Sequence, residues 1–122
     1  MTDTGLVVSQ VLGVTIVNFH KSSILDAQTV DWIARELYVL VDEQARRKII
    51  LDLRQVRFLS STILGVLVAL QKKSQAIKGK LVICGLRPDL SKVFKITKLD
   101  KLFEFADGED EAMRRFDILA KP

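Results

Sequence analysis

The sequence predicts an α/β domain, with one mixed sheet of four or five strands and about four helices packed against it. Segments rich in β-branched residues alternate along the chain with segments whose apolar residues recur at helical spacing. Two short apolar runs, 49–53 and 81–84, flank a long apolar helical segment, which is the pattern of a β-α-β unit with parallel strands. The length of 122 residues, without repeats or Pro/Gly-rich linkers, fits a single domain over residues 1–122.

The first two strands are expected at Leu6–Val8 and Val11–Phe19, separated by a break at Ser9–Gln10. Asp26 then has the chemistry of a helix N-cap. Apolar residues recur after it at helical spacing: Val30, Ile33, Leu37, Leu40 and Val41. An amphipathic helix reaching about Gln44 is therefore predicted.

Buried strands are expected at Ile49–Leu53 and Leu81–Cys84, because short continuous apolar runs suit strands covered on both faces. Between them, Thr62–Lys78 predicts a helix that is strongly apolar in its first half, with Gly79 as its stop at C′. Gly65 lies inside this helix, where glycine costs about 1 kcal/mol relative to alanine. Close packing or a backbone approach would explain it.

The last third of the chain predicts two more helices around a short strand. Pro88–Asp89 is expected to open the third helix, and Leu102–Phe105 to form the strand. The acidic run Glu109–Glu111 precedes Arg114–Arg115, the charge order that a helix dipole favours. The buried face of this last helix is expected to comprise Met113, Phe116 and Leu119.

The charge pattern and hydropathy argue against nucleic-acid and membrane partners. The net charge is +4, from 19 basic and 15 acidic residues, and the basic residues are dispersed among acidic ones. They show no aromatic–basic interleaving and no reader motif, so no nucleic acid is expected. No apolar run reaches the ~18 residues of a membrane helix. The chain start lacks a signal-type segment, and a cytoplasmic location is expected.

The sequence also argues against enzyme and metal chemistry. Cys84 is the single cysteine, so an internal disulfide and a Cys-rich metal site are excluded. It is expected to pack in the core. His20 is the single histidine and is expected to have a surface or packing role. Neither a G-x-S-x-G elbow nor a phosphate-binding glycine loop is present, so we expect no cofactor, no metal and no catalysis.

The most informative segment is Leu51–Leu70, where a buried strand leads through a short loop into the apolar helix. Ser60, Ser61 and Thr62 stand at the start of that helix. In a structural interpretation, one hydroxyl caps the helix by accepting a hydrogen bond from a free backbone N–H. In a functional interpretation, one hydroxyl carries a phosphate, beside unpaired N–H groups and the positive end of the helix dipole. That phosphate would add about −1.5 to −2 charges, which the fold tolerates and a docked partner would not.

A partner surface is expected around these hydroxyls. Val56 and Phe58 are expected to anchor the preceding loop. The apolar residues of the helix cover more than one face, so those not packed on the sheet are either buried under a neighbouring helix or exposed as an interface. The residues expected at the interface are Ser60, Ser61, Thr62, Ile63 and Leu64.

Two aspartates are candidates to support this site. Asp52 ends a buried strand and needs a polar partner, either within the structure or at the switch site. Asp26 is either a simple N-cap or an acid of that site.

The same residues resemble the STAS family of anti-sigma factor antagonists. The strand–loop–helix pattern of that family is similar to Asp52–Leu53, Phe58, Ser60–Thr62 and Leu64–Val66. Ile24–Thr29 resembles the opening of the family's first helix, and Cys84–Phe103 resembles its third motif. The three matches occur in the expected order and cover nearly the whole chain.

The resemblance implies a partner-switching cycle. The unphosphorylated domain would bind an anti-sigma factor, usually a Ser/Thr kinase with a GHKL-type ATP site, and thereby free a sigma factor. Phosphorylation by the kinase would release the domain, and a phosphatase would reset it. The resemblance implies Ser61 as the acceptor, with Asp26 near it.

Ser60 stands here where the family has an aspartate before the acceptor, so Ser60 and Thr62 are alternate acceptors. The alternative function is a STAS interaction or scaffold module without phosphorylation, in a stress-signalling assembly or as a transporter accessory subunit.

Overall fold

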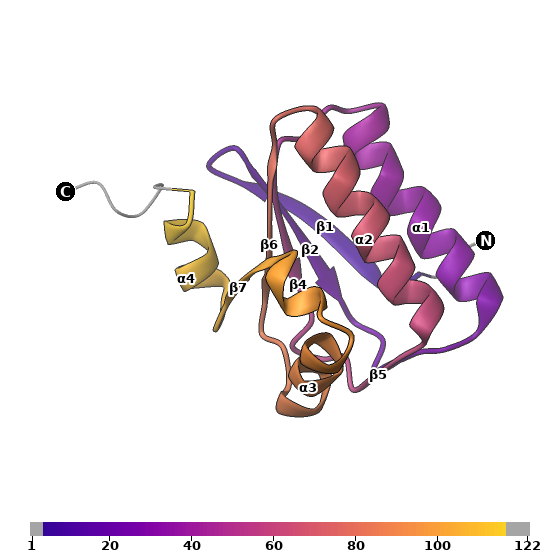
Figure 1. Cartoon of the computed structure of the whole chain (residues 1–122). Coiled ribbons are helices and arrows are strands. Elements are labelled where there is room, and N and C mark those ends of the chain that lie inside the picture. The colour runs from indigo at the N-terminus through magenta and orange to yellow at the C-terminus, as the bar shows by residue number, and fades with distance from the viewer. Residues whose placement is uncertain (1–3, 117–122) are drawn as a thin grey trace.

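The computed structural model describes residues 4–116 and confirms the α/β class (Figure 1). Its main sheet has the strand order β1-β2-β4-β6-β7; β1 is antiparallel to β2, and the other neighbours are parallel. These strands are β1 (Leu6–Val11), β2 (Val14–Phe19), β4 (Lys48–Asp52), β6 (Lys80–Cys84) and β7 (Glu104–Ala106). A separate two-stranded parallel ladder joins β3 (Ser23–Ile24) and β5 (Phe58–Leu59).

Helices cover both faces of the main sheet. They are α1 (Ala27–Asp42), α2 (Ser61–Ala76), α3 (Pro88–Ile96) and α4 (Glu109–Arg114), with a 3₁₀ turn η1 (Leu99–Lys101). Helices α1 and α2 lie side by side on one face, and α4 lies on the other (Figure 1). The larger core lies beneath α1 and α2. A smaller core lies under α4: Val14, Ile16, Ile50, Val82, Cys84, Ala112, Met113 and Phe116.

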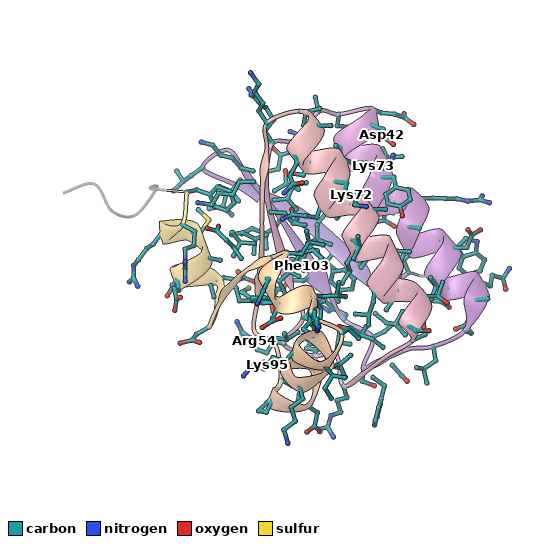
Figure 2. All side chains as sticks on the ribbon, viewed as in Figure 1. Asp42, Arg54, Lys72, Lys73, Lys95 and Phe103 are labelled. Atoms are coloured by element: carbon teal, nitrogen blue, oxygen red, sulfur yellow. The ribbon has the colours of Figure 1, made fainter. Side chains whose placement is uncertain are left out.

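Helix α1 forms as predicted, because Asp26 caps it and the predicted apolar stripe is fully buried. The Asp26 carboxylate accepts a hydrogen bond of 2.9 Å from the Thr29 backbone N–H. At the other end of α1, Asp42 forms an ion pair with Lys73 of α2, with 2.8 Å between Nζ and Oδ2 (Figure 2). The same ammonium lies 4.9 Å from the centre of the Tyr38 ring. These contacts hold the two helices together near their ends.

The predicted break at Ser9–Gln10 is wrong, because β1 continues to Val11. The chain turns at Leu12 and Gly13, whose φ angles are 52° and 82°. Two residues with positive φ make the hairpin turn that matches strand twist. Gly13 adopts this conformation without steric cost, whereas leucine rarely does. Because Leu12 carries no turn signal in the sequence, the turn was predicted too early, at Ser9–Gln10.

The end of α2 also differs from the prediction. Lys78, not Gly79, takes the left-handed C′ position, with φ 59°. Its N–H donates to the Gln75 carbonyl at 3.0 Å, and the Gly79 N–H donates to the Ser74 carbonyl at 2.8 Å. This is the Schellman pattern. Position 79 favours glycine for a different reason: a Cβ there would lie 2.8 Å from the Arg47 carbonyl oxygen.

The C-terminal third follows the prediction with one shift. Strand β7 starts two residues later than expected. The 3₁₀ turn precedes it, and Phe103, between the turn and the strand, is buried. Met113 and Phe116 are buried as predicted, and Leu119 lies outside the described residues. No helix within residues 4–116 combines the length and hydropathy needed to cross a bilayer.

Candidate functional site

The start of α2 is fixed by the small β3–β5 ladder. Ile24 pairs with Leu59, and the Ile24 carbonyl accepts a hydrogen bond of 3.0 Å from the Ser60 N–H. Val56 is fully buried and anchors the loop as predicted. The prediction for Phe58 is wrong, since its side chain is 60% exposed. Successive strand residues point to opposite sides, so Leu59 packs inward and Phe58 points outward.

The three hydroxyls of the serine turn (Ser60–Thr62) have different environments. Ser60 is the N-cap of α2: its backbone is extended, and its Oγ accepts a hydrogen bond of 3.3 Å from the Ile63 N–H. Ser61 and Thr62 occupy the first two helical positions and are exposed. Within residues 4–116, neither of their hydroxyl groups takes part in a side-chain hydrogen bond. The structural interpretation therefore accounts for Ser60 alone.

Two helix N-termini lie at this end of the molecule. Helices α1 and α2 run in the same direction, with their starts beside the β3–β5 ladder (Figure 1). Asp26 is exposed at the start of α1, where the hydrogen bond from the Thr29 backbone lowers the pKa of its carboxyl group. Asp26 and the serine turn thus share one end of the fold, but no hydrogen bond joins them in the described part of the chain. Both helix dipoles favour negative charge here.

Two residues predicted for the partner surface are buried in the core. Ile63 is 0% exposed and Leu64 is 7% exposed, because both belong to the larger core beneath α1 and α2. The apolar character of α2 is therefore explained by burial, and the side chains of Ile63 and Leu64 are removed from the expected surface. Exposed apolar side chains come instead from the ladder and the residue that follows β3: Phe58 lies on β5, and Leu25, directly after β3, is 55% exposed.

Gly65 lies one helical turn beyond Ser61 and is exposed. A Cβ added there would meet no atom within 4 Å beyond its chain neighbours and the backbone of its own helix. Close packing within the chain, the sequence-based explanation for this glycine, is therefore wrong. The helix surface beside Ser61 instead has no side chain at position 65 and is exposed to solvent.

Asp52 lies in a different cluster. Its Oδ1 accepts a hydrogen bond of 3.0 Å from the Arg54 N–H, and its Oδ2 lies 3.5 Å from the Arg54 guanidinium. In the orientation that satisfies both neighbours, the Asn18 amide donates to Glu109 Oε2 at 3.0 Å and to Asp52 Oδ2 at 3.2 Å. No hydrogen bond or ion pair among the described residues joins Asp52 to the serine turn, so its buried carboxylate is satisfied elsewhere.

This Asp52 cluster lines a cavity of about 190 Å³ at the carboxyl end of the sheet. A hydrogen bond with Asp52 raises the pKa of Glu109, and burial and the Asp52 charge act in the same direction. Sequence reasoning missed Asn18 and Glu109. Asn18 lies opposite Asp52 in adjacent parallel strands, which strand register could have indicated, whereas Glu109 arrives from the far end of the chain.

The remaining candidate residues agree with the sequence prediction. Cys84 is fully buried, and burial raises the pKa of its thiol to about 12. A thiol in that environment remains protonated and unreactive at neutral pH. His20 is exposed, and its backbone N–H donates to the Gly5 carbonyl at 2.8 Å.

Comparison with known proteins defines the family. The sequence pattern of the STAS domain matches residues 6–112, and the chain belongs to this family. It is 29% identical to the anti-sigma factor antagonist BtrV of Bordetella bronchiseptica over 93 residues, covering 76% of this chain and 79% of BtrV.

Solved structures share the fold. An anti-sigma factor antagonist from Mycobacterium paratuberculosis superposes with a TM-score of 0.79 at 24% identity, over 90% of this chain and 91% of that one. The Bacillus cell fate determinant SpoIIAA in its phosphorylated form superposes with a TM-score of 0.71 at 20% identity, over 91% of this chain and 98% of that one.

Proposed function

We propose that the chain is a cytoplasmic anti-sigma factor antagonist, switched by phosphorylation of Ser61. It binds an anti-sigma factor, a GHKL-type Ser/Thr kinase, at the end of the fold where α1 and α2 begin. The kinase phosphorylates Ser61 and dissociates, and a phosphatase restores the binding state. Family membership and the anti-sigma factor antagonists among the similar proteins support the binding role.

The observation that carries the proposal is the difference between Ser60 and Ser61. Ser60 caps α2, so its hydroxyl is committed to the helix. Ser61 is exposed at the first helical position, beside free backbone N–H groups. A phosphate there is stabilised by the helix dipole, and it places negative charge at the surface where the partner binds. Binding can therefore be switched without unfolding the domain.

The apolar part of the partner surface is assigned to Leu25 and Phe58, in place of Ile63 and Leu64. Phe58 lies on the ladder that holds the serine turn, Leu25 directly follows β3 of that ladder, and both are more than half exposed. Gly65 extends the same surface along α2 and leaves room for a close approach by the partner.

Phosphosite mapping tests the switch. The chain is incubated with ATP and each GHKL-type kinase encoded in its source genome, and intact mass is measured. One kinase is expected to add one phosphate, which Ser61→Ala abolishes and Thr62→Ala retains. Phosphate on another residue would reject Ser61 as the acceptor. A stable complex without phosphate transfer would leave an interaction or scaffold module as the function.

A further inference from the structure

The two edges of the main sheet differ in how they are protected. At one edge, β7 has three residues and carries Glu104, which pairs with Lys80 at 3.4 Å. Short, charged edges resist pairing with another chain. At the other edge, β1 has six residues and pairs only with β2 among the described strands. It contains no charged residue, proline or bulge.

The β1 edge (residues 6–12) is also apolar and exposed. Val7 is 50% exposed and Leu12 is 64% exposed, and Val8 and Val11 are exposed as well. No charged side chain occurs between residues 4 and 19, in a chain where 28% of residues are charged. An uncharged strand can meet an identical strand without charge repulsion.

Some backbone groups of β1 point away from β2 and can form hydrogen bonds with a further strand. The Gly5 carbonyl accepts from the His20 N–H, so Gly5 and His20 form a hydrogen-bonded pair of the antiparallel ladder. Such pairs alternate, so Val7, Ser9 and Val11 direct their backbone groups toward β2. Val8 and Gln10 consequently direct their N–H and C=O groups outward, to the open edge.

The flank of α1 next to this edge provides further surface. Thr4, just before β1, donates a hydrogen bond of 3.0 Å to Glu36 of α1. Thr4 lines a groove of about 300 Å³ together with Trp32, Arg35, Glu36 and Val39. The flank carries both signs of charge: Arg35 lies beside Glu36 and forms an ion pair with Asp31. The flank beside the uncharged edge therefore carries no large excess of one sign of charge that would repel an identical flank.

We infer that the β1 edge and the adjacent α1 flank bind a second copy of this chain, with the two β1 strands antiparallel about a two-fold axis. Centring the axis on Ser9 places Val7 of each copy opposite Val11 of the other, which makes two apolar pairs. Centring it on Val8 would pair Val8 with Val8, Val7 with Ser9 and Leu6 with Gln10, which makes one apolar pair. Apolar cross-strand pairs are the more stabilising, so the Ser9-centred register is the one assigned.

Disulfide trapping tests this register. In it, the two Ser9 residues form a non-hydrogen-bonded pair with Cα atoms about 4.5 Å apart, within disulfide range. Ser9→Cys is expected to form a covalent dimer under mild oxidation. Gln75→Cys, exposed on α2 and away from β1, is the matched control. Both variants retain Cys84, which is buried and does not compete.

Light scattering over a concentration series measures the association itself. The wild-type chain is expected to dimerise, and Val8→Lys to raise the dimer Kd at least tenfold, while Gln75→Lys, with the same added charge, leaves it unchanged. Circular dichroism of each variant checks that the domain is folded. A monomer at all concentrations, a dimer unaffected by Val8→Lys, or Ser9→Cys cross-linking no faster than Gln75→Cys would overturn the inference. None of these outcomes depends on phosphorylation of Ser61.

Discussion

Ser60 and Ser61 are adjacent in the chain, yet their hydroxyl groups do different things. The Ser60 hydroxyl satisfies a backbone donor of α2, and the Ser61 hydroxyl faces outward. Their substitutions should therefore separate stability from function.

Ser60→Ala should lower the free energy of unfolding by about 1 kcal/mol, the usual cost of losing an N-cap. Ser61→Ala should change it by less than about 0.5 kcal/mol, as is usual for exposed positions. Urea denaturation followed by circular dichroism measures both. Equal losses in the two variants would mean that Ser61 also has a structural role.

Gly65→Ala should stabilise the isolated domain. The added methyl group meets no atom within 4 Å, and the helix gains about 1 kcal/mol from the higher propensity of alanine. For a domain of this size that gain raises Tm by roughly 4 °C. Gly79→Ala is the matched comparison and should destabilise, because its Cβ would clash with the Arg47 carbonyl. A lower Tm for Gly65→Ala would show that the helix does not tolerate a side chain there.

At the scale of elements, one polar contact joins the start of α4 to the sheet, in addition to the apolar core beneath this helix. Glu109 is the first residue of α4 and shares hydrogen bonds with Asp52 and Asn18. Hydrogen bonding to Asp52, burial and the Asp52 charge raise the Glu109 pKa, while Arg54 and Asn18 act against this. The folded domain therefore favours the protonated carboxyl group more than water does.

Glu109→Gln should flatten the dependence of stability on pH. A folded-state pKa above the ordinary value of 4.5 means that the native chain binds this proton more tightly than the unfolded chain. The stability that Glu109 contributes therefore falls as pH rises from 4.5 through its folded-state pKa, and remains lower above it. Glutamine keeps a donor toward Asp52 at every pH. Urea titrations between pH 4.5 and 8 measure the difference, with Asp110→Asn, an exposed neighbour in α4, as the control. Parallel curves for wild type and Glu109→Gln would contradict this account.

Most elements could be predicted from the sequence because their signals are local. The stripe from Val30 to Val41 and the Asp26 cap define α1, and the apolar runs define β4 and β6. The hairpin turn could not be placed, because Leu12 adopts a positive φ that only the paired strands impose. The β3–β5 ladder was missed for a related reason: two-residue strands carry no periodicity.

The candidate site could be predicted only in part. The hydroxyl cluster before α2 is visible in the sequence, but the assignment of the cap to Ser60 depends on backbone geometry. The apolar residues of α2 could not be divided into buried and exposed until α1 was known to pack beside them. The contact between Glu109 and Asp52 joins segments that are distant in the sequence. Hydrophobic periodicity describes only residues close together in the chain, so it could not predict this contact.

For the whole molecule, the proposed surfaces are separate. The serine turn lies at the end where α1 and α2 begin, and the β1 edge runs along one side of the sheet (Figure 1). Self-association through β1 leaves Ser61 and Phe58 on a different part of the fold. A dimer can therefore present two switch sites, each able to bind its partner.

The central claim is that phosphate on Ser61 controls partner binding. The most direct test is calorimetric titration of the anti-sigma factor with the chain, before and after stoichiometric phosphorylation at Ser61. Phosphorylation is expected to raise Kd at least tenfold, a loss of about 1.4 kcal/mol or more, while circular dichroism and Tm show the fold intact. An unchanged Kd with Ser61 fully phosphorylated would contradict the account.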